Sequence, residues 1–350
     1  MKLLLEKIKK AYKEELPFVV YNKPNDTTVF GLFQRNDTLY NITSDFNKSG
    51  FVFAPFNSSE TTILFPLEHS EFIKTSFVNQ YFKFKKELDT NNSSNSEHVK
   101  IVQKAIDAIK NDKFKKVVIS RKEIVALDGV VIEDVYNKLL QKYPNAFVYA
   151  WFHPKIGLWF GASPETLLQI DKNTFSTMAL AGTQVYNNTE NVAWQQKEID
   201  EQWYVTKFIK EQITPIVTAV KVAKTKTVKA GSLLHLKTQI TGVFNEKTSL
   251  KEFINALHPT PAVCGFPKNE AKDFILKNES YKRTYYTGFL GELNLVSERK
   301  THLFVNLRCM QIKDKNAVIF VGGGITKESN ALKEWQETVA KAQVMKSVLQ

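Results

Sequence analysis

The end of the chain carries the residues whose types and spacing are best suited to chemistry. An apolar segment, Val318–Val321, leads into Gly322–Gly324, and a polar loop then precedes a predicted helix that carries Glu334, Glu337 and Lys341. The three charged residues are spaced i, i+3 and i+7, so they share one helical face. Glycines allow backbone N–H groups to approach an anion, and two carboxylates on one face suit a hard cation. The segment predicts a pocket for a carboxylate-bearing ligand with Mg²⁺, and a solvated charged face is the alternative.

Two further segments contain residues that could transfer protons. Lysines flank the apolar strand predicted at Lys115–Arg121. Such lysines are usually solvated, but one that points inward has its pKa lowered by desolvation and can act as a base. Glu165 follows the turn Gly161–Pro164, where it either complements a helix dipole or, if buried, is an acid with a raised pKa. The sequence leaves both alternatives open at each position.

Anion-binding groups are predicted at three other places. The small-residue segment 178–183 is either a simple tight turn or a site where the Gly182 backbone and the Thr183 hydroxyl meet an anionic oxygen. Arg308 lies in an apolar strand, where an unpaired guanidinium is costly, so it requires a carboxylate from the protein or from a ligand. His258 is either a ligand contact or a turn histidine whose ring is satisfied by the protein.

A predicted helix at 197–207 supplies another carboxylate. Glu198 and Glu201 share one of its faces, and Glu201 also follows Lys197 by four residues. An ion pair between Lys197 and Glu201 is the default interpretation. Metal coordination requires Glu201 to face the carboxylates of the C-terminal helix instead.

The elements that position these residues indicate a mixed fold. Residues 1–97 read as a helix followed by short strands, and they end in the polar linker 90–97. Residues 98–350 alternate between strands and helices without another linker, and helical spacing begins at His98. Several adjacent strands lack an intervening helix, which favours an α+β arrangement over a doubly wound sheet.

Composition limits the class of protein. The 350 residues are 43% hydrophobic and include only Cys264 and Cys309, too few for a disulfide framework or a cysteine zinc site. The N-terminus lacks the apolar core of a signal peptide, and no apolar run approaches the ~18 residues of a membrane span. We therefore expect a cytoplasmic monomer. The net charge of +12 comes from scattered lysines without a dense basic stripe, which disfavours nucleic-acid binding and fits an anionic small molecule.

Segments that are individually weak occur together in one order and resemble the chorismate-binding superfamily. They cover about residues 98–348 and read KVVISR, GASPE, ALAGT, KEIDEQ, LHPTPA, RTYYTG, VNLRC and GGGIT…EWQET. The resemblance implies a large fold of two β-sheets flanked by helices, with the active site in a cleft between them. It also implies chorismate as the substrate and Mg²⁺ as the cofactor. In its K-D-x-x-E-H pattern the family commonly has Asp and His where this chain has Glu198 and Gln202.

Within that superfamily the motifs are most similar to the isochorismate synthase branch. Ala181 stands where the aminodeoxychorismate branch has a nucleophilic lysine, so water is the implied nucleophile, and LHPTPA resembles the isochorismate and salicylate branch. A salicylate synthase is the near alternative. An anthranilate-type enzyme is disfavoured because it would need ammonia from a glutaminase partner, which we do not expect. A non-catalytic basic binding protein on the same fold is a further alternative. The pathway, menaquinone or catechol siderophore, is left open.

The resemblance assigns a role to each candidate residue. Lys116 is the base that activates water, and Glu165 is the acid that protonates the departing C4 hydroxyl. Glu201 and Glu337 bind Mg²⁺, with Glu334 acting through water. The residues implied to contact substrate are Gly182, Thr183, His235, His258, Tyr286, Arg308, Gly322, Gly323, Gly324 and Lys341.

Overall fold

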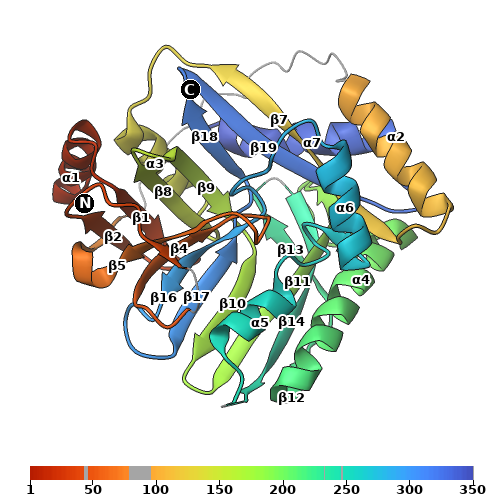
Figure 1. The fold of residues 1–350 in the computed structure, drawn as a ribbon. Coiled ribbons are helices and arrows are strands. Elements are labelled where there is room, and N and C mark those ends of the chain that lie inside the picture. Colours follow the sequence, from red (N-terminus) through yellow and green to blue (C-terminus); the bar gives the residue numbers. More distant parts are fainter. Residues whose placement is uncertain (43–45, 79–95, 232, 246, 350) are drawn as a thin grey trace.

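The strands of this chain form two antiparallel sheets that are stacked face to face (Figure 1). The computed structural model describes residues 1–42, 46–78, 96–231, 233–245 and 247–349, and in this part the sheets have nine and ten strands. The strand order of the first sheet is β15 (Gly265–Phe266), β7 (Lys116–Ala126), β19 (Asn316–Ile325), β18 (Cys309–Lys313), β9 (Gly157–Ser163), β8 (Phe147–His153), β1 (Phe18–Asn22), β2 (Thr28–Gln34) and β6 (Ser70–Ser76).

The second sheet is built mainly from the middle of the chain. Its order is β12 (Val217–Val222), β14 (Leu233–Phe244), β11 (Thr174–Val185), β10 (Thr166–Asp171), β17 (Lys300–Val305), β16 (Phe289–Leu293), β4 (Gly50–Ala54), β5 (Thr62–Pro66) and β3 (Asn41–Ile42), with β13 (Lys226–Ala230) also paired to β14.

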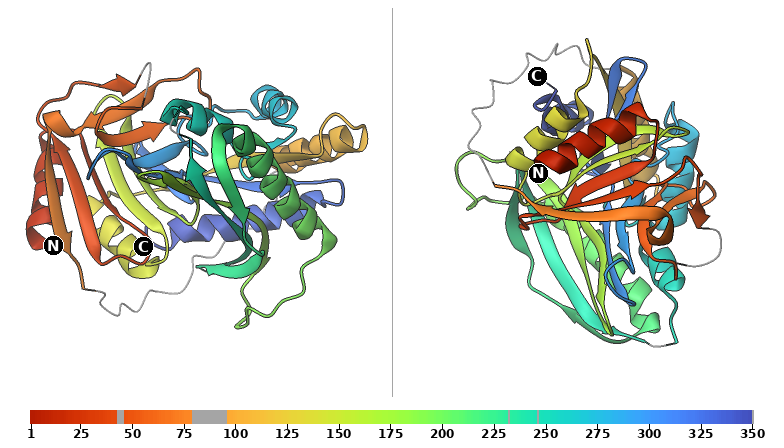
Figure 2. Two further views of the ribbon diagram at one scale, coloured as in Figure 1. Left: turned by 90° about the horizontal axis from the view of Figure 1, so that it is seen from below. Right: turned by 90° about the vertical axis from the view of Figure 1, so that its left-hand side faces the viewer.

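Helices cover the outer faces of both sheets. On the first sheet lie α1 (Lys2–Lys13), α3 (Ile132–Lys142) and α7 (Ala331–Lys346), and Figure 2 shows α1 and α3 side by side. On the second sheet lie α4 (Gln196–Ile213) and α5 (Leu250–Leu257). The end of the first sheet near β7 is covered by α2 (Ser96–Lys110) and α6 (Lys268–Asn278). Two short 3₁₀ turns, η1 (Leu67–His69) and η2 (Thr214–Ile216), complete the described elements.

An aromatic layer fills the space between the sheets. Strand β8 shows how the sequence specifies it, because Tyr149 and Trp151 point into this layer while Val148 and Ala150 point to the helices outside. Both faces of the strand are buried, so its sequence reads as continuously apolar. Phe147 of the first sheet stacks on Phe304 of the second with ring centroids 4.1 Å apart, which joins the two sheets directly.

The predicted α+β architecture of two sheets flanked by helices is confirmed. The first 97 residues add strands to both sheets, with β1, β2 and β6 in one and β3, β4 and β5 in the other. Helix α2 begins at Ser96, two residues before the predicted start. Residues 90–95 of the predicted linker 90–97 lie outside the described residues, and Ser96 and Glu97 belong to α2. Within the described part, no helix has the length and apolar character to cross a membrane.

The aromatic layer generates a stability prediction. Phe147 is fully buried between the sheets, so Phe147→Ala should lower the free energy of unfolding by about 3–5 kcal/mol. Leu3→Ala, at a side chain that is 81% exposed, should change it by less than about 0.5 kcal/mol. Urea denaturation followed by tryptophan fluorescence measures both. Equal effects of the two substitutions would show that the layer does not hold the sheets together.

Candidate active site

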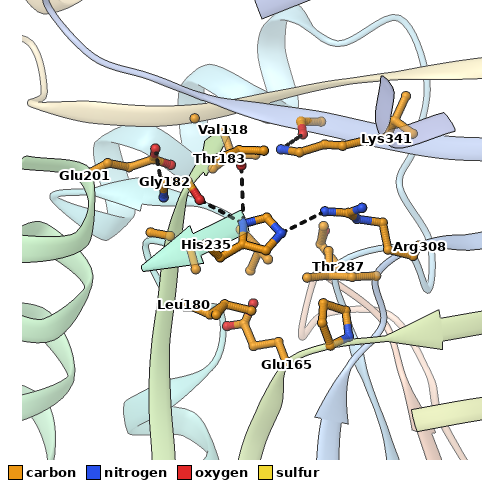
Figure 3. A pocket seen from close by; sticks show the side chains of 18 of the residues that line it. Val118, Glu165, Leu180, Gly182, Thr183, Glu201, His235, Thr287, Arg308 and Lys341 are labelled. Carbon is orange, nitrogen blue, oxygen red and sulfur yellow. Dashed lines mark hydrogen bonds between the residues drawn. The ribbon is translucent and has the colours of Figure 1, made fainter. Parts of the chain in front are cut away.

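A cavity of about 70 Å³ lies where β7 and β19 of one sheet approach β11 and β14 of the other (Figure 3). Of the candidate residues from the sequence, ten line it: Glu165, Gly182, Thr183, Glu201, His235, Tyr286, Arg308, Gly322, Gly324 and Lys341. They come from segments that are up to 176 residues apart in the chain (341 minus 165). The antiparallel pairing of β7 with β19, which places Gly324 opposite Val118, brings the end of the chain to this cavity.

Lys116 points inward from the first position of β7. Its side chain is fully buried, and its Nζ lies 3.0 Å from Oε1 of Glu201, yet the ammonium makes no hydrogen bond of normal geometry with the described residues. Burial lowers the pKa of Lys116, and the nearby Glu201 carboxylate opposes this shift. The structure therefore places, at the predicted position, an inward-pointing lysine whose pKa is lowered.

Glu165 lies in the connection between β9 and β10, and only 2% of it is exposed. Burial raises the pKa of this carboxyl to about 8, with the positive charge of Lys116 acting in the opposite direction. The Glu165 side chain lies at one end of the cavity shown in Figure 3. At neutral pH it is thus a carboxylic acid that carries a proton next to the cavity.

The acidic residues around the glycine strand are each paired with a lysine. Lys197 contacts Glu334 at 2.5 Å, and Lys341 contacts Glu337 at 2.6 Å. The predicted ion pair between Lys197 and Glu201 is therefore wrong, because Glu201 turns inward to Lys116 while Lys197 reaches across to α7.

The environment of α4 gives Glu198 and Glu201 different roles. Glu198 forms a capping box with Gln195 at the start of the helix rather than sharing a ligand role with Glu201. Burial acts to raise the pKa of Glu201, but the positive charges of three neighbouring lysines lower it overall, so this carboxylate stays ionised.

The glycines of β19 leave room for these carboxylates. A Cβ at Gly323 would lie 3.3 Å from Oε2 of Glu334 and 3.6 Å from Oε1 of Glu337, and a Cβ at Gly324 would overlap Glu201. Oε2 of Glu334 has no hydrogen-bond partner among the described residues. Burial, followed by the charge of Glu337, raises the pKa of Glu334 to about 7. Across the described residues, no three histidine, cysteine or acidic side chains form a ready-made ligand set.

Arg308 and His235 form the polar centre of the cavity. Nη2 of Arg308 lies 3.3 Å from Nε2 of His235, whose Nδ1 lies 2.8 Å from the carbonyl oxygen of Gly182. Burial and the charge of Arg308 lower the pKa of His235 to about 3, so a neutral ring donates from Nδ1 and accepts at Nε2. The guanidinium forms no salt bridge with a carboxylate among the described residues. Arg308 also has a φ of 48°, a strained conformation for a residue with a side chain.

His258 does not line the cavity. It is buried with Nε2 3.1 Å from the carbonyl oxygen of Thr287, and its ring makes an edge contact with Phe289. The structure therefore corresponds to the alternative of a satisfied turn histidine, and not to the predicted substrate contact.

Arg283 is a structural residue whose role the sequence did not reveal. It pairs with Glu279 at 2.6 Å and donates to the carbonyl oxygens of Val118 and Val263 at 2.7 and 2.8 Å, and to the hydroxyl of Thr287 at 3.3 Å. The last three residues line the cavity. Thus one buried guanidinium fixes three parts of the wall. Its presence in RTYYTG marks a buried arginine, but only the fold shows which backbone groups it binds.

The site combines a buried lysine, a buried acid, a guanidinium without a salt bridge among the described residues, and a glycine strand bordered by carboxylates. A comparison of sequences agrees with this combination. The model of the family described as "Chorismate binding enzyme" matches residues 58–350. This chain belongs to that family.

Relatives within the family share part of their length with this member. The chain is 29% identical over 261 residues to isochorismate synthase MenF of Bacillus subtilis, covering 72% of this chain and 55% of the relative. It is also 29% identical over 246 residues to isochorismate synthase EntC of Escherichia coli K12, covering 67% and 62%. The chain thus matches less than two thirds of the length of these relatives.

A solved structure agrees with the fold. DhbC of Bacillus anthracis, described as a candidate 2,3-dihydroxybenzoate-specific isochorismate synthase, has a TM-score of 0.81 at 24% identity and covers 99% of both chains. The likeness extends through the first 97 residues, in which the sequence motifs were lacking.

The raised pKa of Glu165 generates a prediction about stability. Because the pKa rises from 4.5 to about 8 on folding, the native protein holds a proton that the unfolded chain releases between these pH values. Stability from this group is therefore present below pH 4.5 and is lost as the pH rises through 8. Glu165→Gln should be about as stable as the wild type at pH 5 and more stable by roughly 4 kcal/mol at pH 8, at about 1.4 kcal/mol per pKa unit.

Denaturant unfolding at the two pH values measures this difference. Glu298→Gln, which removes an exposed carboxylate, should not change the pH dependence. A Glu165→Gln protein with the pH dependence of the wild type would show that Glu165 is ionised in the native state.

Proposed function

We propose that this protein is an isochorismate synthase, an isomerase that adds water at C2 of chorismate and releases the C4 hydroxyl. The observation that carries this proposal is the pair of buried groups with opposite pKa shifts, Lys116 shifted down and Glu165 shifted up. Isomerisation by water addition needs a base for the attacking water and an acid for the departing hydroxyl. The same loss of water produces both shifts, because desolvation disfavours the charged form of either group.

The proton transfers follow from the two protonation states. Neutral Lys116 takes a proton from water as the oxygen bonds to C2, and both ring double bonds shift, from C1=C2 to C1=C6 and from C5=C6 to C4=C5, as the C4–O bond breaks. Glu165 gives its proton to the leaving oxygen, so one water enters and one leaves. Ala181 provides no amine that could replace water as the nucleophile. The neighbouring Glu201 keeps Lys116 oriented but opposes its deprotonation, so the binding of a cation by Glu201 would favour the neutral amine.

The substrate carboxylates have matching partners in the cavity. Chorismate carries one carboxylate on the ring and one on its pyruvyl group. Arg308 offers a guanidinium that forms no salt bridge with the acidic side chains of the described residues, which suits bidentate binding of the pyruvyl carboxylate. Tyr286 and Lys341 line the same cavity, and neutral His235 holds Arg308 toward it.

The residues around β19 fit Mg²⁺. Glu201, Glu334 and Glu337 would hold it, since Oε2 of Glu334 has no partner among the described residues and the glycines of β19 let all three carboxylates lie close to the strand. When bound, the ion offsets the negative charge of the ring carboxylate. Lys197 and Lys341, which pair with two of these glutamates, would compensate the acidic charge in the absence of the ion.

Product analysis with chorismate and Mg²⁺ tests the proposed activity. The wild-type protein should yield isochorismate, whereas salicylate with pyruvate would identify a salicylate synthase. Lys116→Ala and Glu165→Gln should each reduce turnover by about 10²-fold or more, because each removes one proton-transfer group. Lys115→Ala, which alters the exposed neighbouring lysine, should retain wild-type turnover. An active Lys116→Ala protein would contradict the mechanism, and a wild-type protein without turnover, with or without ammonia, would favour the non-catalytic alternative.

Thermal unfolding with and without Mg²⁺ tests the metal site independently of turnover. Mg²⁺ at 100 times its dissociation constant should stabilise the wild type by about 2.7 kcal/mol and raise its melting temperature. The double variant Glu334→Gln/Glu337→Gln should lose this increase, whereas Glu328→Gln, in the exposed turn before α7, should keep it. An undiminished increase in the double variant would place the ion elsewhere.

A further inference from the structure

A second and larger cavity, of about 730 Å³, adjoins the catalytic cavity. The two share Pro164, Leu180 and Arg308 as lining residues. The walls of the larger cavity come from the end of α3, from β13 and β14, and from the end of α7. The roles proposed above use only its boundary residue Arg308.

The wall of the larger cavity is strongly positive. Lys142, Lys229, Lys237 and Arg308 line it, and its described lining residues include no aspartate or glutamate. Lys229 is paired with Leu234 of β14, so its side chain leaves the sheet on the face opposite to that of Lys237, and its ammonium lies 3.5 Å from the ring centroid of Tyr186. This concentration of one sign of charge in a concave surface raises the local concentration of an anion.

Lys237 is the residue that links the two cavities. It follows His235 by two positions on β14, so both side chains lie on the same face of the sheet. Its cross-strand neighbour on β11 is Leu180, which lines both cavities, and its neighbour on β13 is Lys226.

The surroundings of Lys237 favour a ligand with negative charge. Within the described residues its ammonium makes no ion pair or hydrogen bond, although the side chain is half-buried. Burial lowers the pKa of Lys237, and a like charge directly opposite on the neighbouring strand is also unfavourable. The half-buried charge of Lys237 thus disfavours folding. An anionic ligand that binds beside the catalytic cavity would pair with this charge, which explains its position.

We propose that the larger cavity is the vestibule through which the dicarboxylate substrate enters, with Lys237 attracting its carboxylates before Arg308 binds one of them. This inference rests on the proposed function, because it takes a dianion as the substrate. It assigns Lys237 to substrate capture rather than to proton transfer. Its removal should therefore change substrate association and leave the proton transfers intact.

Steady-state kinetics at two ionic strengths test this assignment. The variant Lys237→Met should reduce kcat/KM about 5-fold at low salt and change kcat by less than about twofold. The loss should shrink at high salt, because the Debye length falls from about 30 Å at 0.01 M to about 3 Å at 1 M. Lys221→Met, at an exposed lysine of β12 that lines neither cavity, should behave as the wild type. An unchanged kcat/KM in Lys237→Met, or an equal loss in Lys221→Met, would overturn the proposal.

A chemical probe tests the vestibule without turnover. Val228→Cys places a thiol in its wall, while the native Cys264 and Cys309 are fully buried. A sulfonate-bearing methanethiosulfonate should modify this thiol about 10-fold faster than a trimethylammonium-bearing one, after correction for their rates with a free thiol. Adding Lys237→Met should abolish the preference.

The two experiments separate the two proposals. Equal modification rates for both reagents would overturn the vestibule even if chorismate is turned over. A preference for the anionic reagent in a protein that does not turn over chorismate would overturn the proposed function while supporting anion capture by this cavity.

Discussion

The burial of Lys116 beside Glu201 is the constraint on which the site depends. An ammonium without water is costly unless a carboxylate lies close, and Glu201 at 3.0 Å provides it. The same exclusion of water acts on Glu165 and keeps its proton in place. The same water-poor environment thus lowers the pKa of Lys116 and raises the pKa of Glu165. Both shifts follow from burial in the space between the two sheets.

The rest of the fold makes this environment rigid. Arg283 binds three parts of the cavity wall, and the glycines of β19 let α7 bring its carboxylates close to the strand. Several of these features oppose folding, including the raised pKa of Glu165 and the strained backbone of Arg308. The aromatic layer between the sheets offsets them, since large fully buried rings contribute strongly to the hydrophobic free energy of folding.

Positive side chains have different surroundings in the larger cavity, at the boundary between the two cavities and around the catalytic cavity. Lysines, with no aspartate or glutamate among the described lining residues, line the larger cavity, a guanidinium lies at the boundary, and lysine–glutamate pairs surround the catalytic cavity. Neutral His235 lies between Arg308 and the Gly182 carbonyl, so it orients the guanidinium without adding repulsion. Part of the net charge of +12 is therefore concentrated at the larger cavity. Composition alone could not show where in the molecule this charge lies.

The sequence by itself determined the α+β class, the shared face of Glu334, Glu337 and Lys341, and the family resemblance, because each follows from spacing or from a motif along the chain. Strand alternation and helical periodicity are local properties, and β8 and α7 display them directly. The sequence also indicated that Arg308 needs a carboxylate, since burial of a guanidinium has the same cost in any fold.

Only the tertiary structure decided which residues meet. Lys197 and Glu201 are correctly spaced for an ion pair, but contacts across 137 and 85 residues of chain bind them to Glu334 and Lys116 instead (334 minus 197, and 201 minus 116). His258 proved to be held by Thr287, and Arg283 proved to fix the cavity wall, because their partners depend on how distant loops pack. The protonation states of Lys116 and Glu165 were likewise decided only by the tertiary structure. Desolvation is a property of the enclosed space, and that space exists only once the two sheets have come together.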